Sequence, residues 1–180
     1  TCSAAWAIQL KKAGFDGLVV VGASERPTMI VVDDGRVDIV PAEDLWGLDA
    51  LEASARVRSR LGGGFRAMVI GTAGEKLVRI SSVLTDDRRV CARTGPGAVW
   101  GAKKLKAIAV RGSGEIPVHD ADLLKKLNTE WLLKAPNTVR GRSLGEYGTA
   151  GGVTTFIQTG NLPIMHWRRG ELPEAENLSG

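Results

Sequence analysis

The sequence predicts an α+β domain followed by the beginning of an all-α region. Short β-rich runs alternate with helical patterns as far as Gly112, and no β-rich run follows that residue. Helical patterns occupy residues 120–133 and 149–158 instead. The two expected domains therefore span residues 1–112 and 113–180.

Local patterns predict the elements of the first half. Apolar residues at helical spacing predict a helix over residues 4–13, and the apolar run LVVV predicts a buried strand over residues 18–21. Residues 28–40 predict a β-hairpin, because Asp33-Asp34-Gly35 separates two β-branched runs and Asp-Gly favours a tight turn. A surface helix is expected over residues 48–61, ending at the glycines 62–64. Further strands are expected over residues 65–70, 77–84 and 106–110.

The composition is that of a folded globular protein. The chain has 180 residues, of which 43% are hydrophobic and 24% charged, with a net charge of +4. Basic and acidic residues are interspersed and aromatic residues are few, so nucleic-acid binding is not expected. No apolar run reaches the roughly 20 residues of a membrane span. Two cysteines, Cys2 and Cys91, predict a reducing, cytoplasmic setting and cannot supply a four-thiolate cluster.

Glycine is the compositional outlier, with 23 residues gathered in clusters. Residues 86–101 (DDRRVCARTGPGAVWG) place three arginines and three glycines between two expected strands. Guanidinium groups and main-chain N–H groups at glycines together suit a phosphate. A tight turn with solvated arginines is the alternative, and neither G-x-G-x-x-G nor a P-loop fits the spacing. A second cluster, residues 71–76 (GTAGEK), is either a ligand-facing loop or an ordinary turn.

The segment 97–110 (GAVWGAKKLKAIAV) carries a resemblance to a known family. It is similar to the signature G-A-V-M-G-S-K-N-L-K-A-I of the tungstopterin aldehyde:ferredoxin oxidoreductases. Residues 10–20 (LKKAGFDGLVV) resemble that family's L-K-x-A-G-Y-D-A-I-V-V, and residues 70–78 (IGTAGEKLV) resemble I-G-P-A-G-E-N-L-V. In the helical region, YGT at 147–149 and GNLP at 160–163 resemble Y-G-T and G-x-x-P.

The resemblance implies a longer enzyme in which an α+β domain precedes two helical domains. The chain is then expected to be the N-terminal part of such an enzyme without its first segment. In the family, the dithiolenes of two pterins hold tungsten, for which molybdenum is the alternative, and magnesium bridges the pterin phosphates. A 4Fe-4S cluster bound by C-x-x-C-x-x-x-C and a later cysteine, and the acid/base carboxylate and histidine, are expected beyond Gly180. No catalytic residue is therefore assigned within the chain.

The family's pterin contacts carry over onto two stretches. Its N-S-G-G falls on residues 1–4, with Thr1 in place of the asparagine whose carbonyl reaches magnesium, and Ser3 in place of a glycine. Its R-A-A-G-R-G-G falls on residues 89–95, where both arginines are kept. Val90 replaces a small residue whose carbonyl faces magnesium in the family, so the resemblance implies that the Val90 carbonyl is a second magnesium ligand. Ala92 and Thr94 replace glycines in that stretch. The implied cofactor-binding residues are Thr1, Ser3, Arg89, Val90, Ala92, Arg93 and Gly95.

The function that the resemblance implies is oxidation of an aldehyde to a carboxylic acid. Electrons would pass through the iron–sulfur cluster to ferredoxin or to an iron–sulfur electron-transfer subunit, in an oligomeric enzyme. Because the departures from the family's glycines indicate a divergent branch, two alternatives stay open. One is a catalytic subunit of the benzoyl-CoA reductase type acting on an aromatic thioester, and the other is a non-catalytic scaffold subunit.

Overall fold

The computed structural model describes residues 5–87 and 89–179. The chain divides into two compact units, Thr1–Pro117 and Val118–Gly180, and each is described by itself. Mixed strands and helices form the first unit, whereas the second contains helices and turns and, among its described residues, a single isolated bridge, Ile164–Arg169. The predicted α+β class is confirmed.

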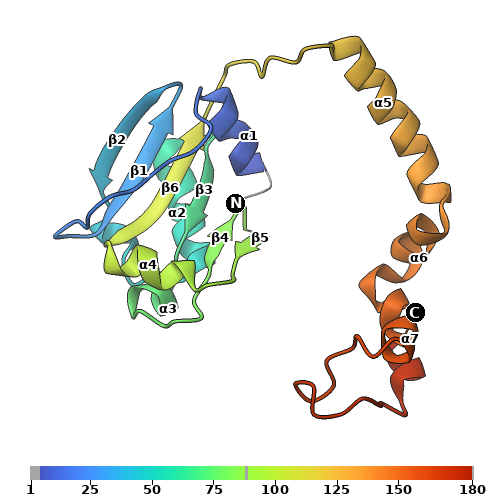
Figure 1. Ribbon diagram of the computed structural model, residues 1–180. Helices are drawn as coiled ribbons and strands as arrows, with labels where there is room; N and C mark the ends of the chain where they lie inside the picture. The colour runs from blue at the N-terminus through green and yellow to red at the C-terminus, as the bar shows by residue number, and fades with distance from the viewer. Residues whose placement is uncertain (1–4, 88, 180) are drawn as a thin grey trace. The chain divides into compact units, whose positions relative to one another are not determined.

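A six-stranded mixed sheet is the centre of the first unit (Figure 1). Strands β1 and β6 are parallel to each other, and every other neighbouring pair is antiparallel. The long central strand β6 is therefore paired on both edges, while β2 and β5 lie at the two edges of the sheet. In spatial order the strands are β2 (Arg36–Pro41), β1 (Thr28–Asp33), β6 (Leu105–Arg111), β3 (Arg66–Val69), β4 (Val83–Thr85) and β5 (Arg89–Cys91).

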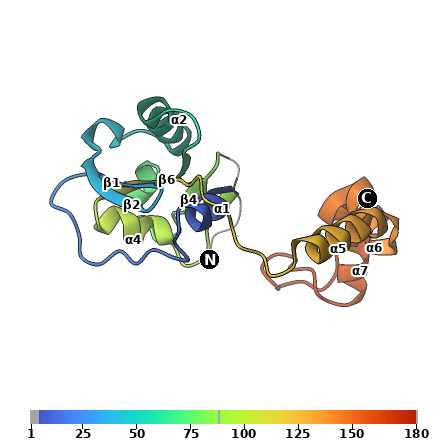
Figure 2. The same cartoon turned by 90° about the horizontal axis from the view of Figure 1, so that it is seen from above.

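Helices cover both faces of the sheet (Figure 2). Side chains alternate along β6, so Ile108 and Val110 pack on the face beneath α1 (Ala5–Lys12), whereas Ala107 and Ala109 pack beneath α2 (Ala50–Leu61). Helix α4 (Pro96–Ala102) lies on the same side as α1, and the short α3 (Thr72–Glu75) packs against α4. Two apolar cores, one on each face, thus hold the sheet.

The predicted hairpin is confirmed. Strands β1 and β2 pair in the register Ile30 to Ile39, and Asp34 and Gly35 occupy the turn with φ of 43° and 87°. These positive angles are those of the two-residue turn that Asp-Gly favours. Beside the turn, the Arg111 guanidinium donates to both carboxylate oxygens of Asp33 at 2.7 and 2.6 Å. This hydrogen bonding holds the pKa of the Asp33 carboxyl below its usual range.

Two of the predicted strands are wrong. Residues 18–21 form no strand, because none of the described residues pairs with them. Residues 77–82 are mostly turns that continue from α3, where Leu77 has a φ of 58°, and the strand begins only at Val83. The structure instead forms α3, β5 and α4 in segments that the sequence analysis treated as glycine-rich loops.

Helix α2 begins after an N-cap that the sequence pattern did not identify. An Asp49 carboxylate oxygen accepts the N–H groups of Leu51 and Glu52 at 2.8 and 2.9 Å. Because these N–H groups have no partner inside the helix, we expect Asp49→Ala to lower the free energy of unfolding by about 1 kcal/mol. Asp49→Asn keeps an accepting oxygen, so it should lower the free energy of unfolding by only a few tenths of a kcal/mol. Denaturant unfolding of the three proteins tests this, and equal losses in both variants would contradict the capping role.

The second unit consists of α5 (Ala121–Lys134), α6 (Val139–Tyr147) and α7 (Val153–Gln158) with connecting turns. Helix α5 agrees with the helix predicted over residues 120–133, whereas the one predicted over 149–158 begins as a 3-10 turn, Gly148–Gly152. Helix α6 was not predicted. None of these three helices contains a buried residue, and Trp131 of α5 is exposed.

Candidate functional site

A cleft of about 1030 Å³ opens on the side of the sheet that carries α1 and α4. This volume lies at the upper end of the range for small-molecule and cofactor sites, about 300–1,000 Å³. Aromatic and aliphatic side chains form one part of its wall, and cationic residues contribute to the rest. The apolar part includes Trp6, Phe15, Leu18, Val20 and Trp100, and the cationic residues are Lys11, Arg93 and Lys103.

Helix α1 forms one wall of the cleft. Its buried residue Trp6 holds it in place through two hydrogen bonds, one from the main chain and one from the side chain. The Trp6 indole N–H donates to the Ile108 carbonyl of β6 at 3.2 Å, while the Trp6 main-chain N–H donates to an Asp86 carboxylate oxygen at 3.2 Å. The second bond ties the start of α1 to the turn between β4 and β5. The start of α1 is thereby connected to the turn that leads into β5, whose residues Val90 and Cys91 line the cleft.

The structure brings three of the expected site residues to this cleft: Val90, Ala92 and Arg93 all line it. Arg89 lies in the edge strand β5 and is exposed, but it is not part of the lining. Gly95 is buried at the N-cap of α4. Thr1 and Ser3 lie outside the described residues.

Among the described cations that line the cleft, Arg93 is the one without a side-chain partner. Of the other two, Lys11 pairs with Asp16, and Lys103 Nζ donates to the Gly22 carbonyl at 2.7 Å. Neither Arg93 nor Arg89 donates a side-chain hydrogen bond to any residue that the structure describes. An unpaired guanidinium fork suits phosphate oxygens, which accept two parallel hydrogen bonds.

The glycines of the 86–101 segment serve internal packing. A Cβ on Gly95 would lie 1.8 Å from the Arg79 carbonyl oxygen, and one on Gly101 would lie 2.0 Å from the Gly74 carbonyl oxygen. The Gly95 and Gly97 N–H groups already donate to Ala92 and Ser81 carbonyls at 3.3 and 3.0 Å. The expectation that glycine N–H groups here face a phosphate is therefore corrected: these two are occupied by the chain itself.

Thr94, which replaces one of the family's glycines, keeps a glycine-like backbone. Its φ is 73°, a conformation that is unfavourable for a β-branched residue, and Gly95 follows with 66°. Its hydroxyl donates to the Arg93 carbonyl at 2.5 Å. The substitution therefore leaves the chain path between Arg93 and α4 in the left-handed conformation that glycine readily adopts.

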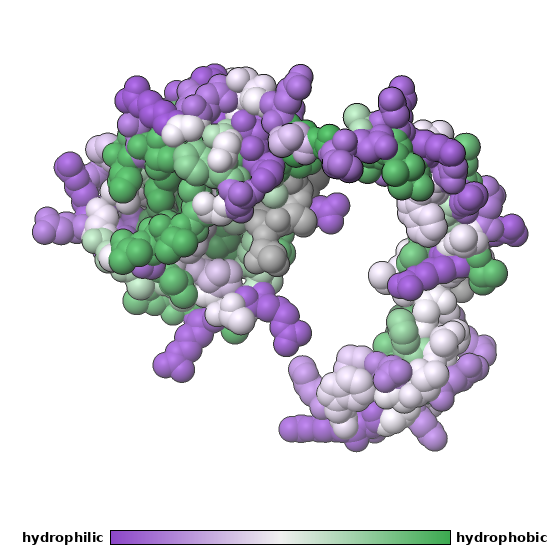
Figure 3. Space-filling view, turned by 45° about the horizontal axis from the view of Figure 1, so that its top comes forward, coloured by the Kyte–Doolittle hydropathy of each residue, from purple (hydrophilic) through white to green (hydrophobic). Residues whose placement is uncertain are grey.

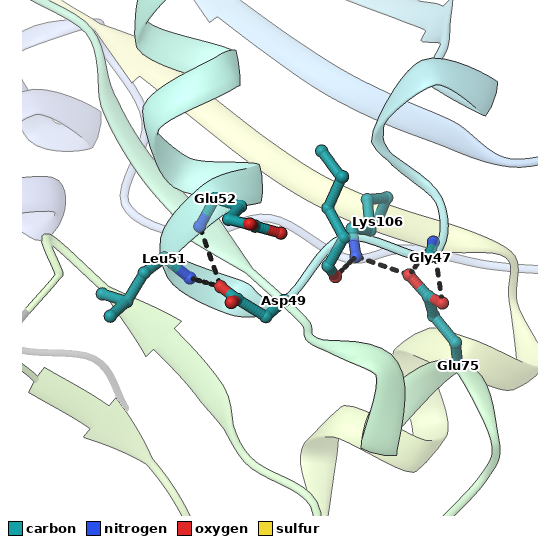
Figure 4. Close-up of polar contacts among 7 residues, drawn as sticks. Gly47, Asp49, Leu51, Glu52, Glu75 and Lys106 are labelled. Atoms are coloured by element: carbon teal, nitrogen blue, oxygen red, sulfur yellow. Dashed lines mark hydrogen bonds and ion pairs between the residues drawn. The ribbon is translucent and has the colours of Figure 1, made fainter.

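A buried ion pair, Lys106 with Glu75, was not identified from the sequence. Lys106 of β6 is fully buried, and its Nζ lies 2.5 Å from a carboxylate oxygen of Glu75 and 2.9 Å from the Leu48 carbonyl (Figure 4). The Glu75 carboxylate also accepts the Gly47 N–H at 3.0 Å. The signal available in the sequence was a lysine at the start of an otherwise apolar run, together with a glutamate in the 71–76 cluster. Within that cluster the Glu75 side chain therefore points into the protein interior, whereas Thr72, Ala73 and Lys76 are exposed.

Lys106 reaches Glu75 because β6 has an irregularity at this point. Thr28 of β1 pairs with Leu105 and the next residue, Met29, pairs with Ala107, so the ladder passes over Lys106. An extra residue of this kind redirects a side chain relative to the regular alternation.

The family described as "Aldehyde ferredoxin oxidoreductase, N-terminal domain" matches residues 1–112. The chain is 38% identical to a tungsten-containing aldehyde ferredoxin oxidoreductase of Thermococcus kodakarensis and 37% identical to one of Pyrococcus furiosus, over 96% of its own length in each case. The chain belongs to the aldehyde ferredoxin oxidoreductase family. It spans 29% of the length of these relatives.

Two further similarities show the breadth of the family. An "Aliphatic sulfonate oxidoreductase, WOR-like subunit" of Pyrococcus furiosus is 30% identical, again over 96% of this chain and 29% of the relative. Among solved structures, the active site complex BamBC of benzoyl coenzyme A reductase with 1,5-dienoyl-CoA superimposes with a TM-score of 0.70 at 32% identity. That match covers 73% of this chain and 20% of the other.

The described residues contain neither a membrane-spanning helix nor a cluster of metal ligands. None of the helices in residues 5–87 and 89–179 is long and apolar enough to cross a membrane. Within the same residues, no three His, Cys, Asp or Glu side chains gather closely enough to hold a metal ion.

Proposed function

We propose that this chain supplies a phosphate-binding floor for the pterin cofactor of a tungsten enzyme that oxidises an aldehyde to a carboxylic acid. The observation that carries the proposal is Arg93, an unpaired guanidinium on the cleft wall, in a chain of the aldehyde ferredoxin oxidoreductase family. Molybdenum is the alternative metal.

The residues present fit such a cofactor. The cleft has the volume of a large ligand site, and it combines an aromatic and aliphatic wall, suited to a planar ring, with an unpaired cation suited to phosphate. Edge strand β5 has no further strand beside it among the described residues, so main-chain groups on its outer edge are open to a ligand. Arg89, Ala92 and Arg93 would lie along the phosphates, Gly95 would shape the loop, and the Val90 carbonyl would reach magnesium. Thr1 and Ser3 are proposed for the same site.

This chain's own residues bind and orient rather than react. The bound metal–pterin group would supply the two-electron redox chemistry. Arg93 and Arg89 would neutralise phosphate charge and set the position of the cofactor against the sheet. The chain contributes no general acid or base to this proposal.

The complete enzyme would need further components. We propose that a 4Fe-4S cluster bound by residues outside 1–180 carries electrons to ferredoxin or to an iron–sulfur subunit. An oligomeric enzyme accords with two relatives, one of which is described as a subunit and the other as a complex. We also propose a cytoplasmic location for it.

A reductive role on an aromatic thioester is the second candidate. The structural similarity to the benzoyl coenzyme A reductase complex favours it, at a TM-score of 0.70 and 32% identity. A scaffold subunit without cofactor is the third. Metal and pterin analysis of the purified full-length protein separates the scaffold from both enzymes, and assays with aldehydes and with aromatic CoA thioesters separate the two enzymes.

We expect Arg93→Ala in the full-length protein to weaken cofactor retention by roughly ten- to a hundredfold, because charge-assisted hydrogen bonds contribute about 1.5–3 kcal/mol. Arg89→Ala should act in the same direction. The measurement is tungsten and pterin content after purification and dialysis. Arg56→Ala is the matched control, since Arg56 is an exposed arginine of α2 with no side-chain partner among the described residues. Wild-type content in both Arg93→Ala and Arg89→Ala would refute the site.

A further inference from the structure

The segment between α1 and β1 contains four successive residues with unpaired main chains. No N–H or C=O group of residues 18–21 is hydrogen-bonded to any residue that the structure describes. Such a run is an open strand edge, because each group would otherwise bond to a neighbouring strand. The sequence LVVV is also one of strong β-propensity.

Side chains along this run alternate as they do in a strand. Leu18 and Val20 pack against the core beneath α1, whereas Val19 and Val21 are 91% and 88% exposed. One face of the run therefore already has its partner, and the other face is bare. This period of two is the pattern of a strand whose second side has not been covered.

The bare side chains continue onto the neighbouring edge of the sheet. Ile39 and Val37 of β2 pair with Ile30 and Val32, which belong to the core on the α1 side, so they project on that same side. Ile39 is 71% exposed and shares a hollow of about 270 Å³ with Val21. We call Val19, Val21, Val37 and Ile39 the aliphatic patch. Figure 3 shows broad apolar areas on the first unit, on the side of β1 and β2.

The segment is held in place despite its unpaired main chain. Just after it, the Gly22 carbonyl accepts from Lys103 Nζ at 2.7 Å, and the Ser24 N–H donates to the Lys103 carbonyl at 3.0 Å. Both views show the segment crossing the α1 side of the sheet (Figures 1 and 2). A segment that is already held in place and has free hydrogen-bonding groups can receive a partner strand at little further cost in chain entropy.

We propose that residues 18–21 pair with an apolar strand of the same polypeptide from outside residues 1–180, and that this strand covers the aliphatic patch. Strand addition would satisfy the free main-chain groups, and alternate side chains of the added strand would meet the patch. The four side chains of the patch are uncharged, and Lys103, which lines the hollow beside Val21 and Ile39, donates to the Gly22 carbonyl. Depletion of charge is characteristic of the buried centre of an interface. The relatives provide the necessary chain, since residues 1–180 span only 29% of their length. The four patch residues lie outside the lining of the cleft, whereas Leu18 and Val20 of the same run contribute to it.

The test is hydrogen exchange on the full-length protein, at a dilution where light scattering shows a monomer. The amides of residues 18–21 should exchange at least about a hundredfold more slowly than in an unstructured peptide. Val19→Asp and Val21→Asp should each accelerate that exchange about tenfold or more. Leu51→Asp is the matched control, because Leu51 is 58% exposed on α2, over the opposite face of the sheet, and it should leave the exchange unchanged.

The rate of hydrogen exchange at residues 18–21 either supports or overturns the proposed strand pairing. Slow exchange in the monomer that either aspartate variant abolishes supports the proposal. Complete exchange of these amides within seconds in the wild-type protein overturns it without any variant. Protection that disappears on dilution to the monomer also overturns it, since the occupant would then be a second copy.

Discussion

Lys106→Met is expected to lower the free energy of unfolding by about 3–5 kcal/mol, because it leaves the Glu75 carboxylate buried without its cation. The side chains of Lys106 and Glu75 are 0% and 6% exposed, so water cannot replace the lost partner. Methionine matches the length of the lysine stem, so the loss would report charge and hydrogen bonding rather than a cavity. Thermal and denaturant unfolding of the full-length protein measure the effect.

The pair also permits a sharper comparison. Lys106→Met combined with Glu75→Leu removes both charges, and we expect the double variant to be more stable than Lys106→Met alone. Glu75→Leu alone leaves the ammonium with the Leu48 carbonyl as its one partner among the described residues, and should lower the free energy of unfolding by as much as Lys106→Met. If the free energy of unfolding of both single variants lies within about 1 kcal/mol of the wild-type value, the ion pair contributes little to stability and the predicted loss is wrong.

The sequence predicted those strands whose pairing is local. Residues 28–40 contain both strands of the hairpin and the turn between them, so their pattern was sufficient. The run at residues 18–21 is also rich in β-branched residues but has no partner strand among the described residues, and it forms no strand. Strand β5 is only three residues long and begins with an arginine, so no periodicity could be recognised. Composition indicates which segments can form strands, whereas pairing decides which of them do.

The candidate site was predictable where side-chain chemistry was sufficient. The arginine-rich segment was identified from its guanidinium and glycine content, and Arg93 does line the cleft. What its glycines do could not be deduced, because a close approach to a ligand and a close approach to another backbone need the same residue type. Helix α4 was missed for a related reason: its sequence, PGAVWGA, has low helix propensity. Its packing against α3 depends on a contact between Gly101 and Gly74, which are distant in the sequence.

That contact gives the second large effect: Gly101→Ala should destabilise the protein by about 3 kcal/mol. A Cβ at this position would lie 2.0 Å from the Gly74 carbonyl oxygen and 2.7 Å from its carbon, which are main-chain atoms that no rotamer change can move. Helix propensity acts in the opposite direction, since alanine in a helix is favoured over glycine by about 1 kcal/mol. The sign of the change in the free energy of unfolding therefore shows whether the steric clash or the gain in helix propensity is larger.

Gly63→Ala is the matched control for this variant, because Gly63 has no heavy atom within 4 Å of its Cβ position and no left-handed φ. It should be neutral or slightly stabilising, by less than about 1 kcal/mol. Since α4 follows directly after Arg93 and Gly95, a displaced helix should also disturb the cleft, and Gly101→Ala should retain less tungsten and pterin than Gly63→Ala in the full-length protein. Equal stability of the two variants would mean that α3 and α4 separate without cost, and the close packing of these helices would then not be what fixes the arginine loop.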